Sequence, residues 1–547
     1  MENNKKDNCQ YFLIAVICLI VCRWLWMFGK WFLRFIQDPI HMYLVIAIDL
    51  AFTALAVKLV LIKCSKIKKA KDKEASILAP EQGAVYCGKS DKKEAIFVKT
   101  KQRAMHTQVI GTTNAGKTES VILPWAIQDI QQGRGLILID GKADHSLLKK
   151  IWGYSVKAKR ERDFKLFSLS NHDSSYPFNP LFGGTAEEIT ERVFNAFDFE
   201  NPYFRSLQYE VMGQIMRILE ANGVTPTFER INQMITDLPT LQYQVDQVDD
   251  VSLRCWVERY KLLSLSDRDM RTSGLLASLG QFANGKTGSL FNSDKDAINL
   301  DEVLQQNQIV YFQLPVLLSP FLGKATGKLI LQSLQAAIAN RHRGRDHSKR
   351  FFSVFLDDFS EYLYPGFVSI LNKSRSANVG IVFAHQALGD IKTLGEPIAN
   401  SILTNSNLKI FMRGNDPESA EYFSKVIGTE SGTKFTERQI KGLFNQSENT
   451  GDLSVREVEE FTVHPNTFKK ELGVGEAIMQ IPHEAGTKTI KIKFDRCPDT
   501  YAKDLPLIEK TKLTLLETPR AKSKETVQST KSEEGLNAAA VKNTTAA

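Results

Sequence analysis

The hydrophobic pattern opens with two long apolar runs, Tyr11–Leu33 and Ile40–Ile62, each interrupted by two charged residues. Each run is about as long as a helix that crosses a bilayer. A cleaved signal peptide is excluded, because the first run is too long, lacks a small-residue cleavage site and is followed at once by the second. Lysines precede the first run and are concentrated in residues 63–73 after the second. The positive-inside tendency therefore predicts a transmembrane hairpin with both ends in the cytoplasm.

Beyond residue 76 the pattern changes to short apolar runs that alternate with stretches of helical spacing. Residues 76–105 predict short strands and turns. Further strands are expected at His106–Ile110, Gly135–Asp140, Gln308–Leu314, Phe351–Asp358, Val379–Ala384, Leu408–Met412 and Ala477–Ile481. Helices are expected at Glu119–Gln131, Gly327–Asn340 and Pro365–Ser376. This alternation predicts an α/β body with a parallel sheet covered on both faces.

One stretch, residues 185–270, breaks the alternation. It contains few β-branched runs and shows helical periodicity at Ile189–Phe197, Tyr209–Leu219 and Leu253–Leu265. We therefore expect an inserted all-α domain, with the α/β body resuming at about Thr272.

The chain divides into five expected parts. Residues 1–75 form the hairpin and its basic juxtamembrane segment, 76–184 the first part of the α/β body, 185–270 the insertion and 271–517 the second part of the body. Residues 518–547 form the tail, where Lys, Glu, Ser, Thr and Ala replace large apolar residues. Because such a composition cannot build a core, the tail is expected to be disordered.

Composition narrows the classes of site and partner. The chain has 547 residues and 43% hydrophobic content, enough for several cores. Its seven cysteines and nine histidines are scattered without a C-x-x-C pair, which argues against a structural zinc site or a disulfide framework. Residues 1–75 carry twelve Lys and Arg against six Asp and Glu, so +6 of the net charge of +8 lies there and +2 elsewhere. The excess positive charge therefore lies next to the predicted membrane spans. Composition alone gives no evidence that the chain binds nucleic acid.

The strongest motif is a glycine-rich loop that fits G-x-x-x-x-G-K-[ST] at every fixed position. A short strand precedes it and a helical stretch follows, in which Pro124 predicts a kink. Backbone N–H groups of such a loop wrap a polyphosphate, and the helix N-terminus favours the anion. Lys117 is expected on the β/γ-phosphates and the Thr118 hydroxyl on Mg²⁺, which predicts ATP and Mg²⁺ as cofactors. The loop comprises Gly111, Thr112, Thr113, Asn114, Ala115, Gly116, Lys117 and Thr118.

Two apolar runs end in aspartate and compete for the Mg²⁺-binding strand. Gly135–Asp140 ends in a single carboxylate, whereas Phe351–Asp358 ends in two. An ATPase needs one carboxylate for the Mg²⁺ shell and another to orient the attacking water. We therefore assign Asp357 to Mg²⁺ and Asp358 to the water, and interpret Asp140 as the end of the neighbouring strand.

Two further polar residues fit the same chemistry. Gln386 ends the strand after the paired aspartates, where an amide can sense the γ-phosphate; an ordinary turn at a strand end is the alternative. Arg375 ends a helix and precedes that strand. It is an arginine-finger candidate for a neighbouring subunit, or else a cation attracted by a helix C-terminus.

Several landmarks occur in a fixed order: two apolar spans, the glycine-rich loop, DGKAD at Asp140–Asp144, the helical insertion, LDDF, and PGFVSILNKSRSANVGIVFAHQ at Pro365–Gln386. Together they resemble the type IV secretion coupling proteins, the TraD/TraG-like ATPases of conjugation and effector export. The resemblance covers roughly residues 10–500.

The resemblance implies a RecA-like P-loop NTPase domain, a small all-α domain that meets substrate or relaxosome factors, and a homohexameric ring at the bacterial inner membrane. It implies that Lys117 and Thr118 bind phosphate and Mg²⁺, that Asp357 is the Walker B aspartate, that Arg375 acts in trans and that Gln386 is the sensor. The implied partners are DNA, single- or double-stranded, protein substrates, relaxosome or adaptor proteins and components of the type IV secretion channel.

One departure keeps a second interpretation open. The family commonly has Asp-Glu where this chain has Asp357-Asp358, and the shorter side chain is compatible with reduced hydrolysis. A nucleotide-dependent recruitment platform with weak or no hydrolysis is therefore the main alternative to a motor. A third interpretation is an FtsK-like DNA translocase, against which the short anchor and the helical insertion argue.

Overall fold

A computed structural model describes residues 19–27, 29–30, 50–63, 83–199, 201–344, 350–441, 447–500, 504–511 and 513–517. The chain forms two compact units, Met1–Ala79 and Pro80–Ala547. The predicted tail, residues 518–547, lies outside the described residues.

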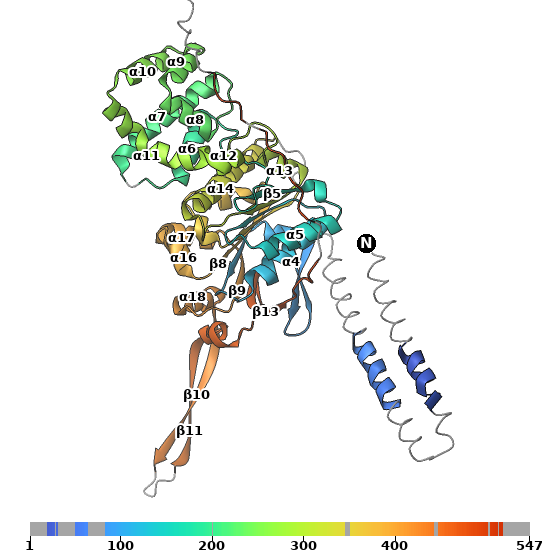
Figure 1. The fold of residues 1–547 in the computed structure, drawn as a ribbon. Helices are drawn as coiled ribbons and strands as arrows, with labels where there is room; N and C mark the ends of the chain where they lie inside the picture. Colours follow the sequence, from blue (N-terminus) through green and yellow to red (C-terminus); the bar gives the residue numbers. More distant parts are fainter. Residues whose placement is uncertain are drawn as a thin grey trace, which may run out of the picture. The chain divides into compact units, whose positions relative to one another are not determined.

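In the N-terminal unit, residues 19–27, 29–30 and 50–63 are helical (Figure 1). The Arg23 guanidinium carbon lies 5.1 Å from the centre of the Phe52 ring, so the two helical stretches are in contact. Large apolar side chains on both, Trp24 and Leu59 among them, are exposed. Within the described residues, no helix combines the length and the apolar content that spanning a bilayer requires. The remaining parts of the two predicted spans lie outside those residues.

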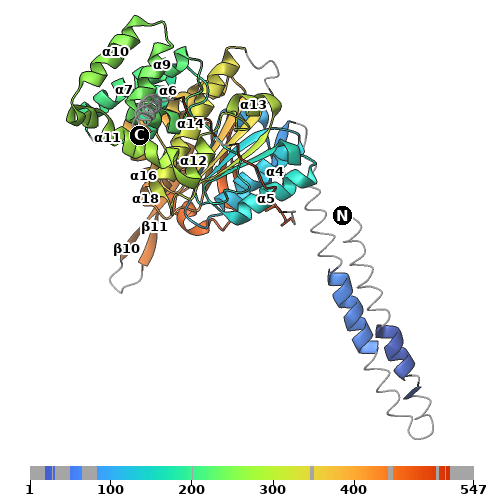
Figure 2. The same ribbon diagram turned by 45° about the horizontal axis from the view of Figure 1, so that its top comes forward.

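Eleven strands of the larger unit form one sheet in the order β2-β1-β13-β12-β9-β3-β8-β7-β4-β6-β5, and β10 and β11 form a separate antiparallel pair (Figures 1 and 2). From β9 to β5 the neighbours are parallel, whereas β12, β13, β1 and β2 extend the sheet in antiparallel fashion. The predicted parallel sheet is therefore confirmed for the part that runs from β9 to the edge strand β5. The strands are β1 (Ala84–Ser90), β2 (Ala95–Lys99), β3 (Thr107–Ile110), β4 (Leu136–Asp140), β5 (Phe164–Ser168), β6 (Ile309–Gln313), β7 (Phe352–Asp357), β8 (Val379–His385), β9 (Leu408–Met412), β10 (Thr429–Lys441), β11 (Ser447–Phe461), β12 (Glu476–His483) and β13 (Gly486–Phe494).

Helices cover both faces of the parallel part, as the alternation predicts. The crossovers after β3 and β4 lead toward β5 and contain α4 and α5, whereas those after β6, β7 and β8 lead the opposite way and contain α14, α15 and α17. Because such crossovers are right-handed, the two groups lie on opposite faces (Figure 1). The helices of this body are α3 (Thr100–Arg103), α4 (Leu123–Gln131), α5 (His145–Lys157), α13 (Leu300–Gln306), α14 (Pro320–His342), α15 (Phe367–Ser374), α16 (Leu388–Lys392), α17 (Glu396–Thr404) and α18 (Pro417–Ile427), with short turns η1 (Thr118–Ile122), η2 (Glu161–Asp163), η3 (Phe359–Tyr362) and η4 (Thr467–Glu471).

The insertion between β5 and β6 is entirely helical in the described residues. Its helices are α6 (Ala186–Ala196), α7 (Pro202–Ala221), α8 (Phe228–Thr236), α9 (Leu238–Asp246), α10 (Val251–Leu262), α11 (Leu265–Ala283) and α12 (Gly285–Phe291). The expected return to the α/β body at about Thr272 needs correction, because Thr272 lies in the middle of α11. That helix buries Leu275, Leu279 and Phe282 and packs on α7 and α8. The helical segment therefore continues to Phe291.

The last described residues also differ from the expected boundary. The expected α/β body extends to residue 517, but Leu516 is buried and its N–H donates to Gln233 Oε1 on α8 at 3.1 Å. Arg230, on the same helix, donates to the carbonyl of Thr514 at 2.8 Å. These last residues therefore pack on the helical insertion.

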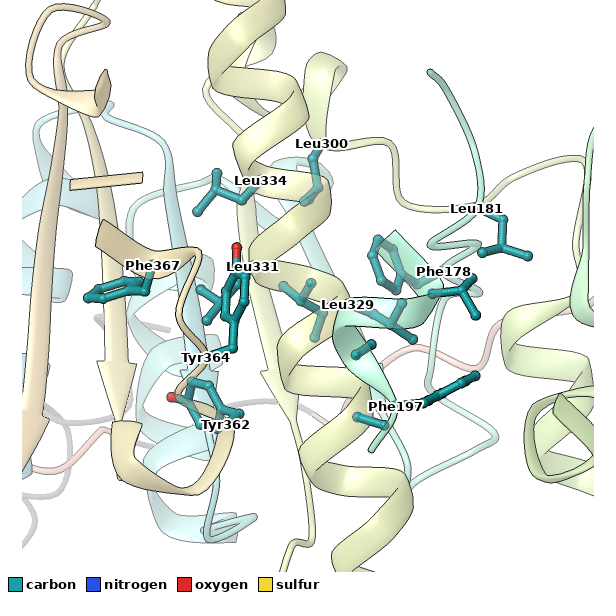
Figure 3. Close-up of a cluster of buried hydrophobic side chains, with 14 of the residues drawn as sticks. Phe178, Leu181, Phe197, Leu300, Leu329, Leu331, Leu334, Tyr362, Tyr364 and Phe367 are labelled. Atoms are coloured by element: carbon teal, nitrogen blue, oxygen red, sulfur yellow. The ribbon is translucent and has the colours of Figure 1, made fainter. Parts of the chain in front are cut away.

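Helix α14 joins the insertion to the sheet through a shared core. It crosses the middle of the cluster in Figure 3, with Tyr362, Tyr364 and Phe367 on one side and Phe178, Leu181 and Phe197 on the other. All six side chains are buried. Phe197 follows α6 of the insertion and all six residues belong to one buried cluster, so the insertion and the sheet share a continuous core.

A buried ion network fixes α4 against the sheet. Arg103 donates two hydrogen bonds to the Asp129 carboxylate, at 2.8 and 2.7 Å, and Ser353 on β7 donates a third at 2.7 Å. Arg134 adds an ion pair at 3.0 Å. The guanidinium of Arg103 also lies 5.2 Å from the centre of the Trp125 ring. Burial acts to raise the pKa of Asp129, but the two arginines outweigh burial and lower it.

Candidate functional site

The glycine-rich loop leaves the carboxyl end of β3, a strand that is buried throughout. Gly111 is required by close packing, since a Cβ there would lie 2.8 Å from Met412 Cβ. Gly116 has φ +100° and Asn114 has φ +64°, conformations that glycine and asparagine tolerate best. The loop is held from outside as well: Thr112 N–H donates to the Arg413 carbonyl at 2.9 Å, and the N–H of Gly475 donates to the carbonyl of Ala115 at 2.9 Å.

The helix after the loop begins irregularly. Residues Thr118–Ile122 form a π-helical turn that leads into α4, and the N–H of Leu123 donates to the Thr118 carbonyl. Pro124, the second residue of α4, has no N–H to donate to the carbonyl four residues before it. The helix is therefore irregular just before Pro124, in a π-turn next to the glycine-rich loop, and the kink expected at Pro124 itself stays a prediction.

Lys117 is folded back onto its own loop. Its Nζ donates to the carbonyl of Gly111 at 2.6 Å and to that of Thr112 at 3.2 Å, and the side chain is buried. Burial lowers the pKa of Lys117, while Asp357 opposes that shift. Two carbonyl oxygens of the loop are thus the hydrogen-bond partners of the ammonium.

Thr118 and Asp357 meet although they are far apart in sequence. The Thr118 hydroxyl donates to Asp357 Oδ2 at 2.7 Å, at the carboxyl end of β7. Burial, and then the neighbouring carboxylate of Asp358, raise the pKa of Asp357 to about 6. A buried carboxylate beside a second carboxylate and a hydroxyl is a donor set that suits a hard divalent cation such as Mg²⁺. The residues present therefore fit the predicted metal.

Asp358 adopts a strained backbone and has a cationic partner. Its φ of +48° is left-handed, which is uncommon outside glycine and asparagine and marks functional sites. Lys142 Nζ lies 2.8 Å from Asp358 Oδ2, and its own side chain is half exposed. Burial alone would lower the pKa of Lys142, but the hydrogen bond to Asp358 and the carboxylates around it raise that pKa.

Asp140 organises the loop that carries Lys142. It ends β4 directly opposite Asp357 in the parallel pairing, which confirms its interpretation as the end of the neighbouring strand. Its carboxylate accepts from the N–H groups of Lys142 at 2.9 Å and Asp144 at 2.6 Å, and from Tyr311 Oη at 2.8 Å. With three donors already bound, Asp140 serves the loop rather than a metal.

Gln386 lies at the phosphate loop, as predicted. It follows β8, and its Oε1 accepts a hydrogen bond from the Thr113 hydroxyl at 3.2 Å. Its backbone N–H donates to Asp390 Oδ2 at 2.8 Å. The side chain is exposed, so the amide is free to turn toward a ligand on the loop.

Arg375 lies near the amino ends of the parallel strands, opposite to the end that carries the glycine-rich loop. It is exposed at the C-terminus of α15, before β8 begins, and is near enough to His106, which precedes β3, to lower the pKa of that histidine after burial. Lys117, Thr118, Asp357, Asp358 and Gln386 all lie at the carboxyl ends of their strands. Arg375 is therefore separated from the phosphate loop of its own chain by the length of β8.

Lys142 is the site residue that the sequence analysis did not single out. The stretch Asp140–Asp144 counted only as a landmark, although it places a cation directly after a buried strand that ends beside the paired aspartates. The available signal was the strand order: once β4 neighbours β7, a lysine two residues past its end reaches Asp358.

Comparisons with known proteins agree with this geometry. A family model described as "TraM recognition site of TraD and TraG" matches residues 352–470. The type 4 coupling protein DotL of Legionella pneumophila is 24% identical over 443 residues, which are 69% of this chain and 56% of DotL. The chain thus spans little more than half the length of that relative.

Solved structures share the fold. The plasmid coupling protein TrwB in complex with ADP and Mg²⁺ is 13% identical, with a TM-score of 0.55 over 80% of this chain and 94% of that chain. TrwB with a non-hydrolysable ATP analogue gives a TM-score of 0.56 at 13% identity, over 81% of this chain and 95% of that chain. The larger unit therefore has a TrwB-like fold with a helical insertion, and both the family model and DotL make the chain similar to the type IV coupling proteins.

Proposed function

We propose that this chain is an inner-membrane ATPase that couples ATP hydrolysis to the delivery of DNA or protein substrates to a type IV secretion channel. The observation that carries the proposal is the meeting of Lys117 and Thr118 with Asp357 and Asp358 at one edge of the sheet. In this proposal residues 1–75 anchor the protein with both ends in the cytoplasm. The fold of TrwB, which binds ADP and Mg²⁺, supports nucleotide binding here.

Each residue of the site has a part in the proposed reaction. Mg²⁺, when bound with ATP, would neutralise charge on the phosphates; Thr118 and Asp357 are the residues placed to hold it. Lys117 exchanges two loop carbonyls for phosphate oxygens, and the loop N–H groups orient the phosphates. Asp358 accepts a hydrogen bond from the attacking water and so orients it. Gln386, which follows β8 and accepts a hydrogen bond from Thr113, senses the γ-phosphate through this contact with the loop.

The proposal requires a ring. Arg375 is separated from its own phosphate loop by the length of a strand, so an arginine that acts on phosphoryl charge has to act on a neighbouring subunit. A homohexamer, as the family resemblance implies, supplies such neighbours. The match to a model of TraM recognition supports the binding of relaxosome or adaptor proteins.

One observation favours the second candidate function, a recruitment platform with weak hydrolysis. The Asp358 carboxylate is engaged by Lys142 at 2.8 Å, so the group assigned to the water already has a partner. A site in this state binds nucleotide through the loop while its second carboxylate is restrained.

ATP hydrolysis by the full chain in detergent, with and without single- or double-stranded DNA, tests the proposal. We expect Mg²⁺-dependent turnover that DNA stimulates and that Lys117→Ala removes, while Lys149→Ala, an exposed lysine on α5, leaves turnover unchanged. Tight ATP binding without turnover under any of these conditions would favour the platform instead.

A further inference from the structure

A cavity of about 720 Å³ lies at the amino edge of the sheet, on the far side from the phosphate loop. Its walls come from α17, α18, the start of β9 and the turn between β12 and β13. Tyr422, Val426 and Ile427 on α18 give it an apolar side, whereas Thr404 and Asn407 give it hydroxyl and amide groups. None of these residues belongs to the nucleotide site.

A buried cation without a counter-ion lines this cavity. Lys409, the second residue of β9, is 8% exposed, and its Nζ donates to the Leu403 carbonyl at 2.7 Å, to Gln108 Oε1 at 3.2 Å and to Ser406 Oγ at 3.4 Å. In the described part of the chain no carboxylate lies within ion-pair distance of it. Burial lowers the pKa of Lys409 to about 8. An uncompensated buried charge is costly, so the site favours an incoming anion.

Lys409 is the first member of a hydrogen-bonded chain that crosses three strands. Gln108 on β3 lies beside it in register and presents its Nε2 to His385 Nε2 on β8 at 2.9 Å. Because Lys409 donates to Gln108 Oε1, the amide must donate to His385 Nε2. His385 then carries its proton on Nδ1 and donates it to the Ala387 carbonyl at 2.8 Å. Burial lowers the pKa of His385 to about 4, in keeping with this neutral tautomer.

The series of hydrogen bonds that begins at Lys409 ends at the nucleotide site. His385 immediately precedes Gln386, which accepts a hydrogen bond from Thr113 of the phosphate loop. The carbonyl of His385 also accepts from the N–H of Gly111, the first residue of that loop, at 3.3 Å. A continuous series of hydrogen bonds and backbone therefore links Lys409 to both Gln386 and Gly111.

We propose that this cavity binds a carboxylate-bearing segment of a partner protein, and that binding there is transmitted to the nucleotide site through Lys409, Gln108 and His385. The carboxylate joins Lys409 and weakens its donation to Gln108. An apolar wall beside amide and hydroxyl groups suits an acidic residue with apolar neighbours on a peptide backbone. Glu484 also lines the cavity, so one or two carboxylates fit it better than a polyacidic run. Binding of the acidic segment in the cavity does not depend on the proposed function, whereas its transmission to the nucleotide site rests on that function.

Binding is tested on the full chain in detergent without nucleotide. The probes are a pool of capped hexapeptides with one central Asp or Glu between Leu, Val, Tyr and Asn, and a matched pool with Asn or Gln at that position. We expect the acidic pool to be retained preferentially and its affinity to fall about 10- to 100-fold in Lys409→Met, since a hydrogen bond between charged groups is lost. Lys425→Met, which removes an exposed lysine from α18, should leave the affinity unchanged.

Equal retention of the two pools, or unchanged affinity in Lys409→Met, would overturn the binding site. A third probe is the chain's own segment 529–540, which contains Glu533 and Glu534. If it outcompetes every acidic peptide through Lys409, the assignment to a partner protein is wrong.

Transmission is tested without relying on hydrolysis. A non-hydrolysable ATP analogue should change the affinity of the acidic peptides by about five-fold or more, because coupling between two sites is reciprocal. Gln108→Met should abolish this change but retain peptide binding. An unchanged peptide affinity with the analogue bound would refute transmission and leave the binding site standing. Absence of turnover in every condition would refute only the proposed motor.

Discussion

Two buried carboxylates, one near each end of the parallel strands, have opposite electrostatic surroundings. At the amino edge, Asp129 is surrounded by Arg103, Arg134 and Ser353, and its pKa is lowered although burial acts to raise it. At the carboxyl edge, Asp357 is almost as buried, but its near neighbour is another carboxylate, and its pKa is raised to about 6. Both are central to the fold, yet only one has all its charge compensated within the chain. The uncompensated carboxylate is therefore the one available to a ligand.

This contrast separates structural from functional charge. A compensated network resists change, since removing one member leaves another buried charge alone. Two neighbouring carboxylates that share one lysine keep excess negative charge, so they favour a bound cation and become more stable when it binds. The predictions below test this distinction, and they run from the largest expected effect to the smallest.

The largest effect is expected for Arg375→Ala. If Arg375 acts in trans, its removal should lower ATP turnover on the order of a thousand-fold or more while ATP binding persists. Rings mixed from Arg375→Ala and Lys117→Ala subunits contain some interfaces with both residues intact, so partial turnover should return. Turnover is measured on mixed and unmixed rings. Mixed rings that form but remain inactive would show that Arg375 acts within its own subunit or only caps α15.

Asp129→Asn should destabilise the larger unit, because Arg103 loses a bidentate partner in the interior. We expect a loss of about 3–5 kcal/mol and a fall in Tm of about 10 °C, measured by thermal unfolding. Asp163→Asn removes the partner of Arg160 at a half-exposed site and is expected to change Tm by no more than about 2 °C. Similar losses from the two variants would mean that burial of the network contributes little.

The Mg²⁺ affinity of the nucleotide-bound protein should depend on pH. The pKa of Asp357 is raised to about 6, so its proton must leave before a cation binds, and below that pH the affinity should fall about ten-fold per unit. Above about pH 7 the affinity should be flat. Titrations of Mg²⁺ between pH 5 and 8 measure this, and Asp357→Asn should bind weakly at every pH.

The same raised pKa has a consequence for stability without ligand. Since the folded pKa of Asp357 lies above the ordinary value of 3.8, folding takes up a proton between about pH 4 and pH 6. The contribution of this group to the free energy of unfolding is therefore fully present below pH 4 and is lost as the pH rises through 6. Asp357→Asn should remove that part of the pH dependence.

The smallest effect is expected for Lys142→Gln. Releasing Asp358 from a half-exposed ion pair, worth about 1 kcal/mol at most, should raise kcat by up to about five-fold. Lys149→Gln is the matched control on α5. A fall in kcat would show instead that Lys142 assists the reaction directly.

Much of the nucleotide site could be predicted from local sequence, because its parts are short and stand next to strong apolar runs. The loop Gly111–Thr118 has a fixed spacing, and a buried strand that ends in Asp357 and Asp358 is visible without any knowledge of tertiary structure. The neighbouring position of Asp140 followed from chemistry, since a lone carboxylate suits the Mg²⁺ strand less well than a pair. Their catalytic and metal-binding roles stay predictions.

The long-range features could not be predicted in this way. Two of them depend on which strands are neighbours. They are the ion pair of Lys142 with Asp358 and the hydrogen-bonded series from Lys409 to His385, and each joins residues far apart in sequence. The boundary at Thr272 was misplaced because α11 has a narrow apolar stripe and many polar residues, which weakens its periodicity. The antiparallel pairing of β13 with β1 likewise joins residues that lie far apart in sequence, such as Gly88 and Phe494.

The hydrogen bond from the N–H of Gly475 to the carbonyl of Ala115 has a consequence for the synthesis of the protein. The strand β3 lies between β8 and β9, and the loop after it is fastened by a residue that the ribosome adds about 360 positions later. At a synthesis rate of about 5–20 residues per second, the delay is on the order of 20–70 s. A growing chain therefore lacks this hydrogen bond to its glycine-rich loop until Gly475 has been synthesised.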